Sequence, residues 1–107
     1  MKKRFTKHNM PESMYRASRF CRIIGNPTAY LLIRYLGKNR KTPTEMSEDL
    51  GISLYTVSRT LRHLRQIEVV RYETAVEGKI YWIKDGDIFS ILDRLEYWID
   101  KERSRKT

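Results

Sequence analysis

The sequence predicts a mainly α-helical domain of five helices with one two-stranded β-hairpin. Apolar residues recur at intervals of three or four along five segments, which is the period of an amphipathic helix. Between the fourth and fifth segments, β-branched and aromatic residues on both sides of a glycine-containing turn indicate the hairpin. The chain of 107 residues suits one domain, and its hydrophobic content of 40% is enough to form a core.

The two ends of the chain differ from this domain. Residues 1–11 are basic, show no apolar period and end in Pro11, so we expect a flexible basic arm. The charged residues from Lys101 onward are expected to fray. The domain itself is expected to occupy residues 12–102, followed by a charged tail at residues 103–107.

Glycines and capping residues delimit the first two helices. The first helix begins at Glu12 and is expected to stop at Gly25, where glycine takes a positive φ at low cost. Asn26 and Pro27 then supply an N-cap and a first helical position. The second helix ends at Gly37. Apolar positions of these two helices are Met14, Ala17, Cys21 and Ile24, then Leu31, Leu32, Tyr35 and Leu36.

Two short helices follow, separated by a glycine. Thr42 and Glu45 have the spacing of a capping box, which starts a third helix that runs through Leu50. Gly51 breaks it, and Ser53 caps a fourth helix over residues 54–67. This pattern over residues 42–70 is a helix-turn-helix. The core positions expected in the fourth helix are Leu54, Val57, Leu61 and Leu64.

Residues 69–74 and 80–83 form the predicted hairpin, with a turn over residues 76–79. Residues 85–87 end the second strand and offer an N-cap for the last helix. A helix-turn-helix followed by a hairpin is a winged helix-turn-helix. The apolar positions of the last helix are Ile88, Ile91, Leu92, Leu95, Trp98 and Ile99.

The net charge favours an anionic partner. Twenty-two Lys and Arg against 13 Asp and Glu give +9 at pH 7, and counterion release then favours nucleic acid. No apolar stretch approaches the roughly 20 residues that span a bilayer, so we expect a cytoplasmic protein. Cys21 is the single cysteine; without a Cys/His cluster it predicts no metal site, and we expect it to be a small core residue.

The outer face of the fourth helix is the candidate DNA-binding surface. Between Asp49 and Glu68 the chain has no carboxylate. Arg59 can donate two hydrogen bonds to guanine, and Thr56 and Ser58 can reach a base edge or a phosphate. For Arg62 and Arg65, which lie nearer the C-terminus of this helix, we expect a favourable interaction with the helix dipole or a contact with a phosphate. The outward residues are Tyr55, Thr56, Ser58, Arg59, Arg62, His63 and Arg65, of which His63 fits a solvated surface histidine better than a ligand.

Other residues complete this candidate surface. Lys79 at the hairpin turn, with Arg71 behind it, offers a second backbone contact, which Glu77 at the tip weakens. Thr44, at the start of the third helix, also belongs to the candidate set. The aromatic residues Tyr72, Tyr81 and Trp82 are expected to pack across the strands instead of stacking on bases.

Over residues 12–100 the order of elements, the run Gly25-Asn26-Pro27-Thr28 and the run Thr56-Val57-Ser58-Arg59 resemble the ArsR-like winged-helix repressors. The resemblance implies a homodimer that represses transcription and releases DNA when a ligand binds. No motif identifies that ligand. In that family the first and last helices form the dimer interface, which here implies Met14, Ala17, Cys21, Phe89, Leu92, Leu95, Trp98 and Ile99.

The sequence also departs from that family. Its metal sensors carry a cysteine pair on the short helix, where this chain has Met46 and Glu48, and the last helix has no histidine, so we expect no metal and no cofactor. Glu68 stands where a glycine usually follows the recognition helix, which brings the geometry of that C-cap into question. A disulfide between the Cys21 residues of two copies is one hypothetical switch.

Two alternatives remain open at this stage. The charge spread over both ends also fits a DNA-binding accessory or chromatin-like protein with little sequence preference. A hairpin that docks a partner protein would instead make the chain an interaction adaptor. We expect no enzyme, because His8 and His63 lie in an arm and on an exposed face, and no Gly-rich phosphate loop is present.

Overall fold

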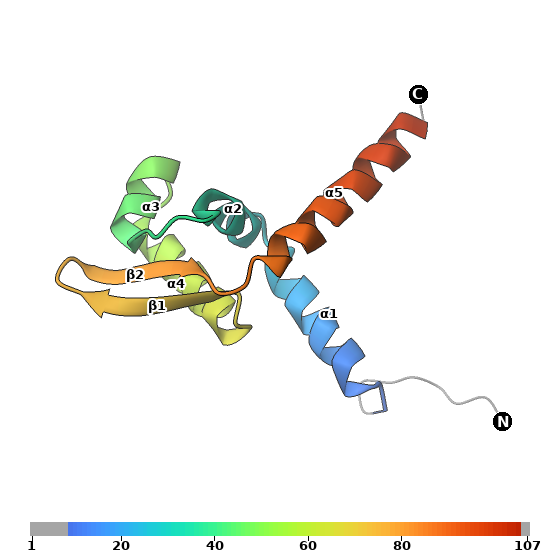
Figure 1. The fold of residues 1–107 in the computed structure, drawn as a ribbon, viewed down its shortest axis with the longest axis horizontal. Coiled ribbons are helices and arrows are strands. Elements are labelled where there is room, and N and C mark those ends of the chain that lie inside the picture. Colours follow the sequence, from blue (N-terminus) through green and yellow to red (C-terminus); the bar gives the residue numbers. More distant parts are fainter. Residues whose placement is uncertain (1–8, 106–107) are drawn as a thin grey trace.

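The computed structural model describes residues 9–105, which form five α-helices and a two-stranded antiparallel sheet (Figure 1). The fold class predicted from the sequence is confirmed. Residues 1–8 of the expected arm and residues 106–107 of the expected tail lie outside the described residues. The elements are α1 (Glu12–Ile24), α2 (Pro27–Leu36), α3 (Pro43–Leu50), α4 (Leu54–Gln66), β1 (Val70–Ala75), β2 (Gly78–Ile83) and α5 (Asp87–Arg105).

Side-chain caps start three of the helices where the sequence predicts them. The Asn26 Oδ1 accepts hydrogen bonds from the first backbone amides of α2, and Ser53 accepts one from Thr56 N at the start of α4. At α3, the Thr42 hydroxyl accepts from Glu45 N while the Glu45 carboxylate accepts from Thr42 N. These bonds satisfy amide donors that a helix leaves unpaired at its start, which is why the boundaries agree.

The ends of two helices differ from expectation. Gly25 caps α1 with φ −71°, so the positive φ expected there is wrong. The chain leaves the helix because Asn26 and Pro27 begin the next one. In contrast, Glu68 does take a positive φ of 61° after α4. Glu68 N donates to Arg65 O and Val69 N donates to Leu64 O, both at 2.9 Å, so the C-cap is a Schellman motif with glutamate in the glycine position.

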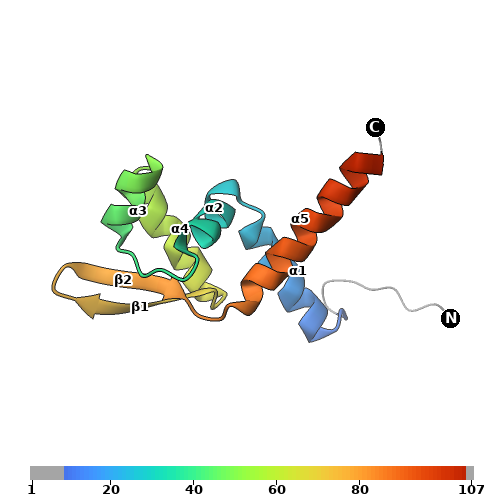
Figure 2. The same ribbon diagram turned by 45° about the horizontal axis from the view of Figure 1, so that its top comes forward.

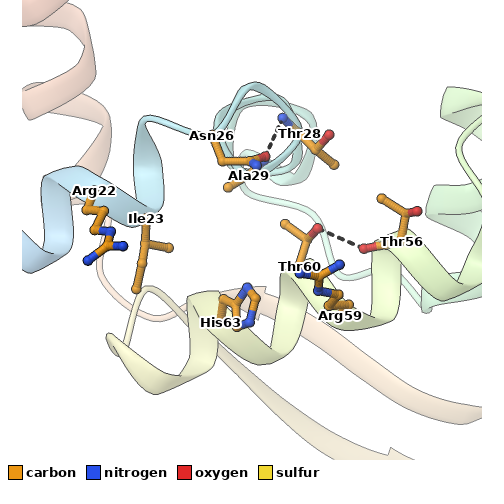
Figure 3. Close-up of a pocket in the computed structure, with 9 residues that line it drawn as sticks. All are labelled: Arg22, Ile23, Asn26, Thr28, Ala29, Thr56, Arg59, Thr60 and His63. Carbon is orange, nitrogen blue, oxygen red and sulfur yellow. Dashed lines mark hydrogen bonds between the residues drawn. The ribbon is translucent and has the colours of Figure 1, made fainter.

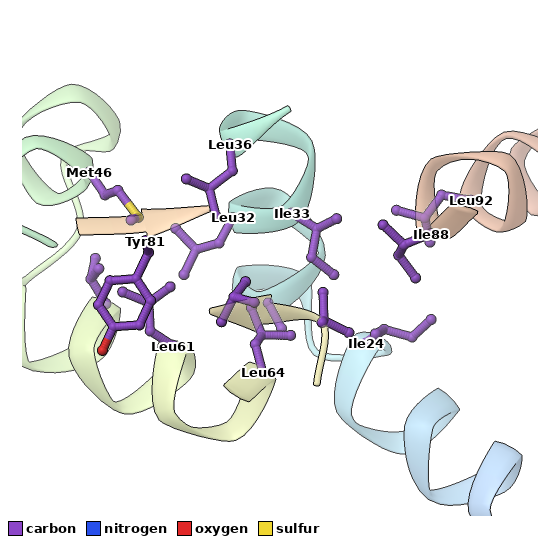
Figure 4. Packing of buried hydrophobic residues seen from close by; sticks show 14 residues of the cluster. Ile24, Leu32, Ile33, Leu36, Met46, Leu61, Leu64, Tyr81, Ile88 and Leu92 are labelled. Atoms are coloured by element: carbon purple, nitrogen blue, oxygen red, sulfur yellow. The ribbon is translucent and has the colours of Figure 1, made fainter. Parts of the chain in front are cut away.

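The core lies between α2, α4 and the hairpin, as Figure 4 shows. Met46 of α3 closes it at one end, and Ile24 of α1 with Ile88 and Leu92 of α5 closes it at the other. Apolar periods of α2 and α4 therefore meet each other. The largest fully buried side chains are Leu32, Ile33, Leu36, Met46, Leu61, Leu64, Leu92, Val57 and Val70.

The hairpin is tighter than the sequence suggested. Ala75 pairs with Gly78, so Val76 and Glu77 alone form the turn and Gly78 and Lys79 belong to β2. Tyr72 lies opposite Tyr81, with ring centroids 5.2 Å apart, and the Arg40 guanidinium lies 4.0 Å from the Trp82 ring centroid. These contacts confirm that the hairpin aromatics are engaged in packing.

Helices α1 and α5 extend away from the core in diverging directions, as the two views in Figure 1 and Figure 2 show. In α1, all of which the structure describes, Ile24 alone is buried. In α5 only the first turns reach the core, and the helix continues past the expected limit of 102 to Arg105. Helix α5 thus leaves most of its apolar residues exposed, and α1 leaves Met14, Ala17 and Cys21 exposed.

Three sequence-based expectations about burial are wrong. Cys21 is exposed, because the chain covers α1 only at its C-terminal end. Leu54 is 48% exposed, since the first turn of α4 extends beyond the core. Leu92, expected at a dimer interface, is fully buried within one chain, and Phe89 also packs against the core. The reason is that the start of α5 faces the domain.

Among the helices of the described residues, none is both long and apolar enough to cross a membrane.

Candidate nucleic-acid interface

The outward face of α4 follows from which of its residues are buried. Val57, Thr60, Leu61 and Leu64 are buried, and the Thr60 hydroxyl donates to the Thr56 carbonyl at 2.7 Å. Helical geometry places the row Tyr55, Arg59 and Arg62 on the opposite side. All three are exposed, Tyr55 by 74%. We call these three residues the outward row.

Thr56 and Ser58 lie on the flanks of α4. Both are only partly exposed, and the Thr56 hydroxyl accepts a hydrogen bond of 2.8 Å from the Ser53 hydroxyl. The centre of the exposed surface is therefore the outward row, in place of the group Thr56, Ser58 and Arg59 that the sequence favoured. Arg59 belongs to both descriptions.

A cationic cleft borders one side of the outward row, between α4, the start of α2 and the end of α1. Its volume is about 320 Å³. Figure 3 shows Arg22 at one end, His63 in the middle and Arg59 with Thr56 at the other end. None of the described residues that line this α2-side cleft carries a carboxylate. They are Arg22, Ile23, Asn26, Thr28, Ala29, Thr56, Arg59, Thr60 and His63.

A second cleft, the hairpin-side cleft, borders the other side of the outward row. It measures about 1040 Å³ and runs between the C-terminal half of α4 and β1. Its charged lining is mixed. The cations are Arg62, Arg65, Arg71 and Lys84, and the acids are Glu68 and Glu73.

The Tyr72 ring joins the hairpin to α4 beside this cleft. Its centroid lies 4.7 Å from the Arg65 guanidinium and 4.7 Å from Lys79 Nζ. Lys79 is therefore on the side of the hairpin that faces α4. A contact between Lys79 and the DNA backbone beside α4 requires this placement. Arg71 lies opposite Trp82 in the strand register, so its side chain is on the other face of the strands from Tyr72; Arg71 also contributes to the lining of the cleft.

The remaining candidate residues are spread more widely. His63 is exposed and lines the α2-side cleft, whereas Thr44 is exposed at the start of α3 and lines neither cleft. Sequence reasoning missed Arg22 and Thr28. The basic residues spaced by three along the first helix were a usable signal, but only the tertiary contact of α1 with α4 gives them a common cleft.

Asp49 is the last acidic residue before α4, and a hydrogen bond directs its carboxylate elsewhere. The Tyr35 hydroxyl of α2 donates to its carboxylate. Burial, followed by this hydrogen bond, raises the pKa of Tyr35 to about 12. The contact fixes α3 against α2 and engages the carboxylate away from the outward row.

The open faces of α1 and α5 form a separate apolar surface. The α5 residues Leu95 and Trp98 are 44% and 56% exposed, and Met14 of α1 is 53% exposed. An apolar groove of about 650 Å³ connects the two helices, and Cys21, Leu31 and Leu95 contribute to its lining. Ile91 and Ile99 extend this surface along α5.

The chain contains, in order, a short helix, a glycine turn with Gly51 at φ 67°, a recognition-type helix and an antiparallel hairpin. The chain has the winged helix-turn-helix fold. No family model matches it, and no curated protein matches it in sequence. Within the described residues, no group of three or more His, Cys, Asp or Glu is placed to hold a metal ion.

Solved structures of winged helix-turn-helix regulators superpose on the chain. HlyU of Vibrio cholerae matches with TM-score 0.71 and 20% identity, covering 80% of this chain and 97% of its own. Rv0081 of Mycobacterium tuberculosis matches with TM-score 0.78 and 21% identity, covering 92% and 98%. The resemblance to ArsR-like regulators is thereby confirmed at the level of the fold.

A third structure is informative about assembly. The homodimeric winged helix-turn-helix DNA-binding domain of Mb0332 from Mycobacterium bovis, a possible ArsR-family regulator, matches with TM-score 0.76 and 14% identity. The match covers 91% of this chain and 94% of that domain. At such identities the similarity establishes a common fold.

Proposed function

We propose that this protein is a sequence-specific, double-stranded DNA-binding transcriptional regulator that acts as a homodimeric repressor. The observation that carries the proposal is the outward row of α4, which lies between two clefts that contain cations. Tyr55, Arg59 and Arg62 offer a phenol and two guanidinium groups to the major groove, where arginine pairs with guanine O6 and N7.

The two clefts support this docking geometry. The major groove is about 12 Å wide and admits one helix, so a sugar-phosphate backbone lies on each side of an inserted helix. With α4 in the groove, one backbone faces the α2-side cleft and the other faces the hairpin-side cleft. Arg65 and Lys79 are positioned for the second backbone, and phosphate contacts there would fix the register.

The exposed apolar surface of α1 and α5 supports the dimer. A monomer that leaves Leu95, Trp98 and Met14 open to water has a large apolar patch, which a second copy would cover. Mb0332 is a homodimer with the same fold. A two-fold axis through α1 and α5 would place the two α4 helices for half-sites about 34 Å apart on one face of the duplex.

Selection of bound sites from random duplex DNA at a stated salt concentration tests the proposal. We expect enrichment of a palindrome, because two copies related by a two-fold axis read two inverted half-sites. Binding without enrichment would favour the DNA-binding accessory protein, and salt-independent failure to bind any duplex would favour the protein adaptor. The proposal includes the cytoplasmic location and the division into arm, domain and tail.

A further inference from the structure

Helix α1 carries a basic face in addition to its apolar one. Tyr15, Ser18, Arg19 and Arg22 lie on one side of the helix, whereas Met14, Ala17 and Cys21 lie on another, as the 100° turn per residue requires. The basic face lines a cleft of about 410 Å³ together with Ile23 and with His63 of α4. We call it the α1 cleft.

The α1 cleft continues the α2-side cleft. Arg22, Ile23 and His63 line both, so one continuous track runs from Arg59 past His63 to the guanidinium groups of Arg22 and Arg19. Hydroxyl groups accompany it at Thr28 and Ser18. Among the described residues that line the two clefts, none is acidic, so the whole track favours an anion.

The cations of this track are not used by the fold. Elsewhere in the described chain, Arg34 and Arg40 form ion pairs, and Arg65 stacks on an aromatic ring. Arg19 and Arg22 have neither kind of contact within residues 9–105, and both are exposed. Structural reasons for the two guanidinium groups are therefore absent in the described chain.

The first turn of α2 does not supply the binding groups. Asn26 Oδ1 already accepts from Thr28 N and Ala29 N, at 2.9 and 3.2 Å. The available donors are thus the side chains of Arg19, Arg22 and His63. Arginine presents a planar fork of N–H groups that matches two phosphate oxygens, and it keeps its charge at any physiological pH.

We propose that α1 binds the DNA backbone next to the groove that α4 enters, with Arg19 and Arg22 each on a phosphate. This inference rests on the proposed function and extends it to a helix otherwise assigned to dimerisation. Arg19 and Arg22 are three residues apart on one face of α1, about 4.5 Å along the helix axis, and each carries a long side chain. Two neighbouring phosphates of the same strand therefore lie within reach.

The salt dependence of DNA binding tests the proposal with the full chain and its selected site. Each neutralised phosphate contributes about −0.9 to the slope of log K against log salt, and the dimer carries two copies of each arginine, so Arg19→Gln with Arg22→Gln should make the slope shallower by about 3.6. Between 50 and 200 mM salt, the variant should lose about 150-fold less affinity than the unmodified protein does. Its selected sequence should stay the same.

Arg94→Gln with Lys101→Gln is the matched control, because it removes the same charge from exposed positions of α5. Its slope should equal that of the unmodified protein. Circular dichroism and sedimentation of both double variants establish that fold and dimer persist. Ethylation interference then locates the contact: modified phosphates beside the recognised groove should impair binding of the unmodified protein and of the control, but not of the α1 variant.

The possible results distinguish a failure of the α1 contact from a failure of the proposed function. Failure of the unmodified protein to bind duplex DNA would overturn the proposed function. Binding with equal slopes and equal interference for the α1 variant and the control would leave that function standing and overturn the α1 contact. A changed selected sequence in the α1 variant would also overturn it, because phosphate contacts carry no direct base readout.

Discussion

Glu68 holds a backbone conformation that glycine adopts more easily than any other residue. With φ at 61° it completes the Schellman motif after α4, and its carboxylate forms an ion pair of 3.2 Å with Lys84 Nζ. The left-handed conformation costs a residue with a Cβ roughly 1–2 kcal/mol, whereas an exposed ion pair contributes about 0–1 kcal/mol. The backbone strain at Glu68 therefore lowers the stability of the fold by more than its ion pair raises it.

Glu68→Gly should raise the free energy of unfolding by about 1 kcal/mol, because glycine relieves the strain and loses only a weak ion pair. Urea denaturation at fixed protomer concentration measures the change. Lys84→Ala is the control that removes the ion pair alone and should lower stability slightly. A Glu68→Gly variant less stable than the Lys84→Ala variant would show that the glutamate has a stabilising role we have not identified.

Arg59 belongs both to the outward row and to the group Thr56, Ser58 and Arg59 that the sequence favoured for base contacts. If it donates to guanine O6 and N7, Arg59→Ala should weaken binding to the selected site by about 1–3 kcal/mol and weaken binding to random DNA less. Titration of both duplexes at one salt concentration measures the two losses. Arg65→Ala, at the hairpin side, should instead weaken both similarly. Equal losses for Arg59→Ala would make Arg59 a phosphate contact.

At the scale of elements, α5 depends on few contacts to hold its direction. Ile88 and Leu92 anchor its first turns in the core. Arg34 of α2 then donates to Asp93 at 2.7 Å and to Glu96 at 2.6 Å, and the Tyr30 hydroxyl donates to Glu96. The C-terminal part of the helix projects away from the domain (Figure 1). The polar cluster therefore sets the angle between α5 and the rest of the fold.

Arg34→Ala should loosen α5 without unfolding the core. Loss of a partly exposed ion-pair cluster costs about 1 kcal/mol, which corresponds to backbone amides of residues 92–102 exchanging about fivefold faster. Hydrogen exchange measured on the intact protein tests this. Arg94→Ala removes a guanidinium from α5 itself and leaves the cluster intact, so its exchange rates should stay unchanged. Faster exchange in both variants would argue against a specific role of Arg34.

The same cluster makes the position of α5 sensitive to acid. The hydrogen bond from Tyr30, followed by that from Arg34, holds the pKa of Glu96 below its ordinary value of 4.5. A depressed carboxyl pKa stabilises the folded arrangement above the ordinary value and loses that contribution as pH falls through the lowered one. Amide chemical shifts of α5 should therefore move below pH 4.5, and Glu96→Gln should abolish that part of the change.

At the scale of the whole molecule, the single chain leaves the apolar surface of α1 and α5 exposed to water. Along α5 the residues Ile91, Leu95 and Trp98 fall on one side and Tyr97 on the other. Tyr97 lies 5.5 Å from the Arg94 guanidinium on that other side. Trp98 therefore lies on the proposed dimer interface, whereas its neighbour Tyr97 lies on the opposite face of α5.

Trp98→Glu should convert the protein to monomers, because an unpaired charge in an apolar interface is costly. Tyr97→Glu is the matched control and should leave the dimer intact. Sedimentation over a range of concentrations measures both, with circular dichroism as the check that each variant is folded. A Trp98→Glu variant that stays dimeric would remove α5 from the interface.

The structural features that could be predicted from the sequence are those that depend on residues close together in the chain. The caps at Asn26, Thr42 and Ser53 and the periods of five helices were predictable, because each depends on residues within one or two turns. The exposure of Cys21 and the burial of Leu92 were not, since periodicity shows that a helix has an apolar side but not which neighbour covers it.

The candidate DNA surface divides in the same way. The sequence by itself determined that a helix without a carboxylate begins at Leu54, with its predicted end at Ile67, because charge and apolar period can both be read from consecutive residues. Only the tertiary structure decided that the outward row runs through Tyr55, Arg59 and Arg62, and that Arg22 joins His63 beside it. Such clefts form between helices distant in sequence, and the packing that brings them together is a property of the whole core.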